Sequence, residues 1–232
     1  MKHILLAGGF ALSATAAFAD TKNFDVKPFD ELHVSTGLQV EVTAGEVFQV
    51  RAEGKSRGLK RLDVTQTGDI VRLSQSEKGL ARFSPFLKMQ DASMTVYVTL
   101  PELTELRVWG GSHVLAKDSL ASIHLTKVSS GSEVELEGIN SLKVTVDISS
   151  GSSATLQGEC DLLIAEASSG ADLRGKGLRC ETAVAEANSG SSTTVYAEQV
   201  EARAYTGGHI NIYGATEVTA KVGSGGHVAR HD

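Results

Sequence analysis

Cysteine is scarce in this sequence, and its scarcity excludes several kinds of site. Cys160 and Cys180 are the only two cysteines. They lie too far apart for a C-x-x-C redox pair, and a structural zinc site would need further thiolate ligands. The residue directly after Ala19, the expected end of an export signal, is Asp20 and not a cysteine, so we expect no lipoprotein anchor.

Aromatic residues, positive charge and long apolar segments are also limited. Aromatic residues make up 5% of the chain and concentrate before residue 110, so we expect no sugar-stacking groove on the later residues. The formal net charge of −6 argues against nucleic acid as a partner and against charge-driven binding to anionic lipid. After residue 19, no apolar segment is long enough to cross a bilayer, so we expect no transmembrane segment.

Residues 1–19 have the pattern of a secretory signal peptide. Lys2 precedes an apolar run from Ile4 to Phe18, and a small-x-small sequence ends at Ala19. We therefore expect cleavage between Ala19 and Asp20. The predicted location is outside the cytoplasm, either in the periplasm or at the cell surface.

From Trp109 onward, the sequence repeats a polar Ser/Thr/Asn-Gly turn between alternating apolar residues. The turn glycines recur with a nearly constant period of about 18–20 residues; they are Gly111, Gly131, Gly151, Gly170, Gly190, Gly208 and Gly226. Between the glycines, apolar and polar residues alternate, as from Leu142 to Ile148, which is typical of a half-buried strand. Such a regular period indicates stacked structural units.

The repeat predicts an all-β fold, namely a single-stranded parallel β-helix (solenoid) with about 18–20 residues per coil. Equivalent residues of successive coils would stack roughly 4.8 Å apart. The polar turn residues would then form a hydrogen-bonded structural column of Ser129, Ser149, Ser168, Asn188, Thr206 and Ser224. We expect irregular coils or a β cap over residues 20–108, regular repeats over 109–228 and a tail at 229–232.

The two cysteines test this register. Cys160 and Cys180 each precede a turn glycine, Gly170 and Gly190 respectively, by the same interval, so they would occupy the same position on adjacent coils. Strand spacing would then place their Cα atoms within the range that a disulfide tolerates. Export to an oxidising compartment also favours a bridge, although two free thiols remain the alternative.

Two loops in the N-terminal part are candidate binding segments. The first is a basic cluster in an otherwise acidic protein; its charged members are Lys55, Arg57, Lys60 and Arg61. It is either a solvated turn or a contact for an acidic glycan or phosphate. The second is the apolar-rich segment 79–91, with Phe83, Phe86 and Leu87, which is either a cap over the core or an exposed contact patch.

The order of motifs resembles the bacterial GIN-domain family, also known as domain of unknown function 2807 or the "putative auto-transporter adhesin head domain". The segments that carry the resemblance are Phe29–Val34, Gly37–Val42 and Leu100–Val108, followed by the serial Ser-Gly turns. The resemblance extends over roughly residues 26–228. It implies an exported, β-helical protein without an established enzymatic site, and it offers no catalytic residues to transfer.

Two side-chain pairs in the repeats were weighed as chemical sites. Glu166 and Glu186 lie one coil apart and should stack; they would be either solvated strand residues, a calcium site or the acid and base of a hydrolase. His209 and His227 should lie on adjacent coils, but two ligands make a weak metal site, so no metal and no cofactor are expected. No segment matches a nucleophile elbow or a phosphate-binding loop.

These observations favour an exported, non-enzymatic β-solenoid that binds or scaffolds an envelope glycan or protein, as an adhesin does. The alternative is a carbohydrate-active β-helix enzyme, either a polysaccharide lyase or a hydrolase. Turnover that disappears on replacement of Glu166 or Glu186 would distinguish the two.

Overall fold

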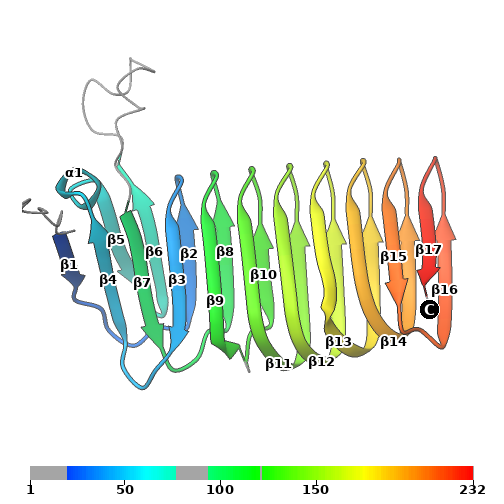
Figure 1. Ribbon diagram of the computed structural model, residues 1–232, viewed down its shortest axis with the longest axis horizontal. Coiled ribbons are helices and arrows are strands. Elements are labelled where there is room, and N and C mark those ends of the chain that lie inside the picture. Colours follow the sequence, from blue (N-terminus) through cyan, green and yellow to red (C-terminus); the bar gives the residue numbers. More distant parts are fainter. Residues whose placement is uncertain (1–19, 77–93, 121, 232) are drawn as a thin grey trace, which may run out of the picture.

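The computed structural model describes residues 20–76, 94–120 and 122–231, and these form a β-solenoid (Figure 1). The first strands are β1 (Asp20–Phe24), β2 (Glu31–Ser35), β3 (Gln39–Ala44), β4 (Gln49–Gly54), β5 (Leu62–Thr67), β6 (Ile70–Gln75), β7 (Met94–Leu100), β8 (Glu105–Trp109) and β9 (His113–Leu120). The later strands are β10 (Leu125–Val128), β11 (Glu133–Ile148), β12 (Ser153–Ala167), β13 (Asp172–Ala187), β14 (Ser192–Ala204), β15 (His209–Tyr213), β16 (Glu217–Val222) and β17 (His227–His231). A short helix, α1 (Ser56–Leu59), precedes β5.

Each coil has two legs that face each other across the core (Figure 1). The first face contains β6, β2, β8, β10, the second halves of β11 to β14, and β16. The second face contains β7, β3, β9, the first halves of β11 to β14, β15 and β17. All of these neighbours pair in parallel, which confirms the predicted parallel β-helix.

A tight turn joins the two legs at one end of each coil. Ser150 and Gly151 have φ angles of 57° and 68°, and the Ser152 N–H donates to the Ser149 carbonyl at 3.3 Å. Positive φ at both central residues is the pattern of a type I′ turn, which favours glycine at the second position. The Gly151 N–H also donates to the Ser169 carbonyl of the next coil at 3.1 Å, so the turns stack in one file.

The turn glycines stack in a single column, as predicted, but the last two glycines of the predicted series are wrong. The file contains Gly111, Gly131, Gly151, Gly170, Gly190, Gly207 and Gly225. Gly208 and Gly226, which the spacing suggested, lie one residue later, where most earlier coils bury a serine side chain. A Cβ at Gly208 would lie 2.1 Å from the Ala187 carbonyl oxygen, so glycine is needed there as well. The predicted polar column shifts with it, because Thr206 and Ser224 are equivalent to Ser150 rather than to Ser149.

The serine that follows four of the turn glycines has a structural role that the repeat did not reveal. These serines are buried; they are Ser112, Ser132, Ser152 and Ser191. The Ser152 hydroxyl donates to the Val128 carbonyl at 3.0 Å, and the Ser191 hydroxyl donates to the Ala167 carbonyl at 2.8 Å. Each of these two hydroxyls therefore has an acceptor, so serine fits this buried position without an unpaired polar group.

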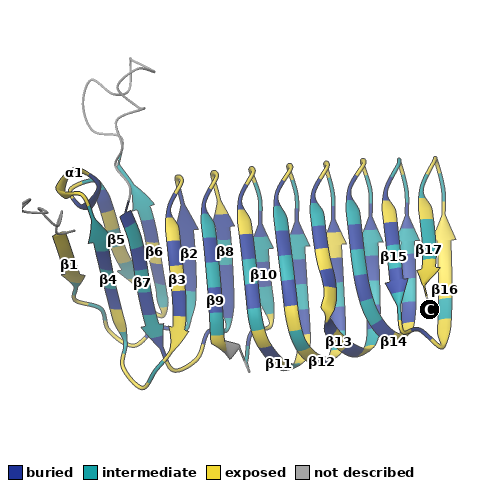
Figure 2. Ribbon diagram, in the orientation of Figure 1, coloured by how far each residue is buried: buried dark blue, intermediate teal, exposed yellow. Residues whose placement is uncertain are grey.

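The core is the narrow layer between the two faces, where every second residue of each leg is buried (Figure 2). On the first face the later coils use small residues, and the inward alanines are buried; they are Ala183, Ala185, Ala187, Ala202 and Ala204. On the second face larger residues such as Leu156, Leu173 and Ile210 fill the core. Burial of each such aliphatic side chain contributes about 1.5–3 kcal/mol relative to exposure.

The N-terminal end is less regular than the repeats. β4 pairs antiparallel with β7, β1 pairs antiparallel with β4, and β5 pairs antiparallel with β6. α1 lies against β1 and β4, and its own last residue, Leu59, is buried. In this part of the chain the antiparallel strands extend the solenoid edge and cover it. Over the described residues, no helix has the length and apolarity needed to span a bilayer.

Candidate binding groove

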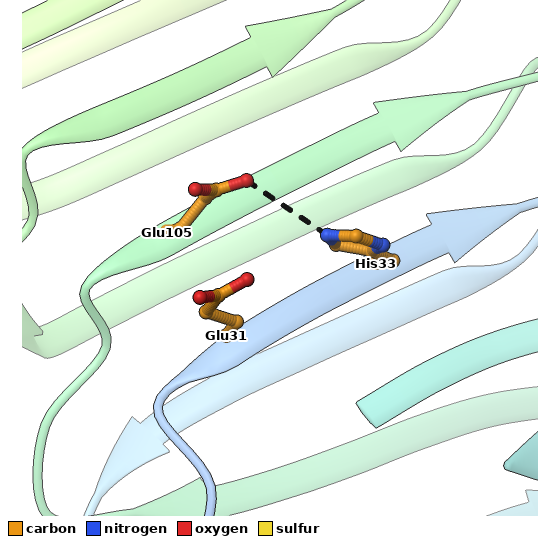
Figure 3. A group of neighbouring side chains, drawn as sticks. All are labelled: Glu31, His33 and Glu105. Carbon is orange, nitrogen blue, oxygen red and sulfur yellow. Dashed lines mark ion pairs between the residues drawn. The ribbon is translucent and has the colours of Figure 1, made fainter. Parts of the chain in front are cut away.

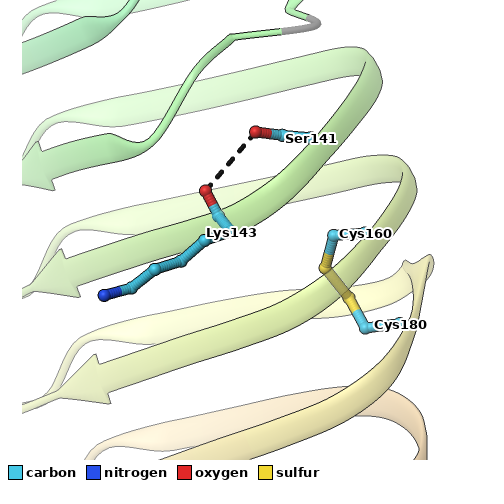
Figure 4. The surroundings of a disulfide bond; sticks show 4 residues. All are labelled: Ser141, Lys143, Cys160 and Cys180. Atoms are coloured by element: carbon cyan, nitrogen blue, oxygen red, sulfur yellow. Dashed lines mark hydrogen bonds between the residues drawn. A yellow bond between two sulfur atoms is a disulfide. The ribbon is translucent and has the colours of Figure 1, made fainter.

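The coils bend sharply where one leg of a long strand turns into the other, and a groove of about 490 Å³ lies on this bend. We call it the bend groove. It is lined by β11, β12, β13 and β14 through Asn140, Ser141, Leu142, Glu159, Cys160, Asp161, Arg179, Cys180, Glu181, Tyr196 and Glu198. The disulfide lies on the curved part of β12 and β13, next to Ser141 of β11 (Figure 4).

The strand register aligns the groove side chains in a row across the coils. Asn140 is paired with Glu159, Glu159 with Arg179, and Arg179 with Tyr196. The row then continues outside the groove to Tyr213 of β15 and His231 of β17. An amide, a carboxylate, a guanidinium and aromatic rings therefore follow one another at the strand spacing of about 4.8 Å.

The bend groove is acidic. Glu159, Asp161, Glu181 and Glu198 are exposed, and none of these carboxylates forms an ion pair or a side-chain hydrogen bond with the described residues. The one guanidinium in the lining belongs to Arg179, whose Cζ lies 5.2 Å from the centroid of the Tyr196 ring. That distance is within the range of a cation–π interaction, which orients the Tyr196 ring.

Aromatic rings extend this row toward the C-terminal coil. The Tyr213 and His231 rings are stacked, with centroids 4.7 Å apart and planes inclined by 15°. The Lys176 ammonium lies 4.0 Å from the centroid of the Tyr213 ring. The Tyr196 ring packs on the backbone at Gly214, where an added Cβ would lie 2.6 Å from the ring carbons. An aromatic surface is therefore present on the repeats, which the low aromatic content had led us not to expect.

The predicted disulfide is present. Cys160 and Cys180 pair in register on β12 and β13, their Cα atoms are 4.5 Å apart, and the two sulfur atoms are bonded. The chain has no other cysteine, so no free thiol remains. The register that predicted the bridge is thereby confirmed.

The other pairs predicted on adjacent coils also lie in register. Glu166 of β12 is paired with Glu186 of β13, and His209 of β15 is paired with His227 of β17, with ring centroids 5.9 Å apart. Both pairs are on outward positions and lie outside the bend groove. The expectation that neither pair forms a metal or catalytic site stays a prediction.

The structure places the basic cluster away from the bend groove. Lys55 and Lys60 flank α1, Arg57 lies within it, and Arg61 follows it, at the end of the solenoid opposite to the C-terminal coils (Figure 1). Binding by this cluster is untested. Phe83, Phe86, Leu87 and the signal-cleavage residue Ala19 lie outside the described residues, and Asp20 is the first residue of β1.

Comparison with known proteins decides the family. The sequence profile of the family described as "putative auto-transporter adhesin, head GIN domain" matches residues 28–228. The chain belongs to the GIN-domain family. No curated protein matches this GIN domain.

Solved structures share the fold of this GIN domain at low sequence identity. A protein of Bacteroides fragilis NCTC 9343, described as a "putative adhesin", matches with a TM-score of 0.76 and 15% identity, over 93% of this chain and 97% of that chain. A "putative adhesin" of Parabacteroides distasonis ATCC 8503 matches with a TM-score of 0.70 and 13% identity, over 92% and 97%. A "putative lipid binding protein" of the same organism matches with a TM-score of 0.67 and 10% identity, over 93% and 98%. At these identities the likeness extends to the fold alone.

Proposed function

We propose that this GIN domain is an exported, non-enzymatic binding protein of the adhesin type, which holds a glycan of the bacterial envelope in the bend groove. The family description and the signal-peptide pattern of residues 1–19 support export and an adhesin-like role. The observation that carries the proposal is the row of Asn140, Glu159, Arg179 and Tyr196, which presents different hydrogen-bonding groups and an aromatic ring along one groove.

The chemistry of this row matches a sugar chain. Sugar rings have apolar C–H faces that pack on aromatic rings, and their hydroxyls donate hydrogen bonds to carboxylate and amide oxygens. Glu159, Asp161 and Glu181 supply acceptors with no competing partner among the described residues. Because these carboxylates repel an anion, the preferred glycan is neutral or carries amino groups.

The test compares matched tyrosine variants on a glycan array of neutral, amino and acidic glycans. Tyr196→Ala and the double variant Glu159→Gln/Glu181→Gln should each weaken binding by about tenfold or more, because truncation of a central anchor costs more than about 1 kcal/mol. Tyr97→Ala is the control, since Tyr97 lies 4.7 Å from Arg51 in a similar cation–π pair outside the bend groove.

Three results would contradict the proposal. Equal loss of binding in Tyr97→Ala and Tyr196→Ala would indicate that the glycan does not bind in the bend groove. Preference for acidic glycans would favour the basic cluster around α1. Binding to proteins of the envelope without any glycan binding would replace the proposed ligand class.

An enzyme is the second candidate, and the register of Glu166 and Glu186 favours it. Their backbones are neighbours at about 4.8 Å, and a retaining glycosidase holds its two carboxyl groups about 5–5.5 Å apart. If the chain is an enzyme, it releases reducing ends or unsaturated products from polysaccharides, and Glu166→Gln abolishes the release. If it binds glycans without turnover, the binding proposal stands.

A further inference from the structure

A second cluster of chemically competent side chains lies on the first face, at the other end of the solenoid from the C-terminal coils. Glu31 and His33 project from β2, and Glu105 projects from the neighbouring strand β8 (Figure 3). Each residue offers a ligand atom, and the three atoms lie within 4.8 Å of one another. No residue of this cluster lines the bend groove, so a ligand bound here is independent of the proposed function.

The His33 imidazole is the decisive group. His33 is 9% exposed, and its Nε2 atom is buried with no hydrogen-bond partner among the described residues. Nε2 points toward Glu105, whose Oε1 lies 3.9 Å away, too far for a hydrogen bond (Figure 3). Since a buried polar atom without a partner costs free energy, an additional group at this position would stabilise the protein.

The charges around the cluster come from every neighbouring strand. Asp30 and Asp69 add negative charge beside Glu31, whereas Arg72 of β6 and Arg107 of β8 lie in register with His33. Arg107 Nε donates to Glu105 Oε1, and its side chain is 42% exposed. Arg107 therefore orients the carboxylate, as second partners of metal ligands do, and it is free to move toward solvent.

The protonation states suit a cation. Burial lowers the pKa of His33, and Arg72 and Arg107 act in the same direction, which favours the neutral imidazole that a metal ion requires as a ligand. Burial also raises the pKa of Glu31, with the Glu105 carboxylate as the next cause. Two carboxylates that repel each other beside a neutral imidazole are stabilised by a shared positive ion.

We propose that Glu31, His33 and Glu105 form a binding site for a divalent transition metal ion, with Zn²⁺ as the best match. One nitrogen and two carboxylate oxygens are ligands that Zn²⁺ accepts, and three protein ligands leave a fourth position for water or a partner. Tetrahedral coordination needs ligand atoms about 3.3 Å apart, so the side chains close in slightly on binding. Glu31 is only half-buried and makes most of this movement.

The ion would act as a clamp between coils. Glu31 and Glu105 lie opposite each other on β2 and β8, although strands β3 to β7 of the described residues lie between them along the chain. The disulfide provides a covalent link between β12 and β13 in the later coils, and a metal would supply the corresponding link near the N-terminal end.

The experiment first removes any bound metal from the chain with a chelator and then titrates the chain with Zn²⁺ alone. Calorimetry measures Zn²⁺ binding, and thermal unfolding measures the change in Tm. We expect one Zn²⁺ per chain and a saturable rise in Tm, with a shift of the His33 imidazole nitrogen resonances. Glu31→Gln should weaken Zn²⁺ binding at least tenfold, and His33→Gln should do the same. Glu31→Gln is the safer variant, because the partly exposed side chain tolerates the isosteric amide.

The matched control is the double variant His209→Gln/His227→Gln. It removes a pair of histidines that neighbour each other on β15 and β17, outside the proposed site, and should leave Zn²⁺ binding unchanged. Absence of Zn²⁺ binding by the wild-type chain would overturn the proposal. So would Zn²⁺ affinity that is retained in both Glu31→Gln and His33→Gln, or lost in the control.

Discussion

Gly151 and Gly158 belong to one coil, and each excludes a side chain for a different reason. Gly151 has φ +68° in the tight turn, and an added Cβ there would meet no atom within 4 Å. Gly158 has φ +137° on the bend, and an added Cβ would lie 2.1 Å from the Ile139 carbonyl oxygen of the preceding coil. Glycine is needed at position 151 because of the backbone conformation, and at position 158 because two coils approach each other closely there.

Alanine substitution separates the two effects. Gly151→Ala should lower the free energy of unfolding by about 1–2 kcal/mol, the cost of a left-handed residue with a Cβ. Gly158→Ala should cost clearly more, because the backbones must move apart as well. Urea unfolding of the two variants checks the order, and equal losses would contradict the role of Gly158.

Thr126 and Thr193 each place an unpaired hydroxyl group in the apolar core of the described residues. Both side chains are fully buried, and their hydroxyl oxygens have no hydrogen-bond partner in the described part of the chain. Valine has nearly the same shape without the hydroxyl. Thr126→Val and Thr193→Val should therefore each raise the free energy of unfolding by about 1–3 kcal/mol. A decrease in thermal and urea stability would indicate that the hydroxyl has a partner, such as a buried water.

At the scale of the strands, the disulfide joins two coils that are already neighbours. In the chain-entropy description, a bridge that closes a loop of this length stabilises the native state by about 3 kcal/mol through the unfolded chain. Cys160→Ser/Cys180→Ser should therefore lower the free energy of unfolding by about that amount and leave the fold intact. Urea titration of the double variant measures the loss, and a circular dichroism spectrum like that of the wild type shows that the β-structure persists.

The periodic strands explain why the fold could be predicted and most of the groove could not. A constant step of 20 residues correctly pairs Cys160 with Cys180. The same step would pair Arg179 with Gln199. The register instead pairs Arg179 with Tyr196, because it shifts between Gly175 and Arg179. The shorter coil does show in the turn glycines, because Gly190 and Gly207 occupy equivalent turns only 17 residues apart. That spacing does not show where along the coil the register shifts, so the aromatic row could not be found by arithmetic.

The glutamate–histidine cluster was hidden for another reason. Glu31 and Glu105 belong to strands that are separated by β3 to β7 and by a segment outside the described residues, and this connection has no fixed period. Sequence reasoning recognised both strands as family motifs but had no register between them. Their burial, and the missing partner of His33, are properties of the assembled coils alone.

For the molecule as a whole, the two ends of the solenoid differ. Near the N-terminus, β1, β4 and β5 add antiparallel strands and a helix to the edge. At the other end, β16 and β17 each have a strand neighbour on one side only within the described residues, and most of their residues are exposed (Figure 2). An open edge of parallel strands is a template for association with another chain.

We expect Arg230 to protect this open edge. It pairs in register with Ile212, so it occupies the inward column that Leu136, Leu156 and Val195 fill in earlier coils. A charged group at the end of an apolar column prevents a further coil, or a second chain, from stacking on it without burying the guanidinium. The charge therefore ends the column in the same way that inward charges protect other sheet edges.

Replacement of this charge should convert the end of the solenoid into a contact surface. Arg230→Ile would complete the apolar column, and we expect concentration-dependent end-to-end association of the purified chain in sedimentation velocity. Arg174→Ile is the matched control, because its side chain is 57% exposed on an outward position and adds the same apolar group away from the edge. If both variants associate alike, general surface hydrophobicity is the cause. If Arg230→Ile stays in the same state as the wild type, the exposed backbone edge of β16 and β17 is protected by other means, and Arg230 has no such role.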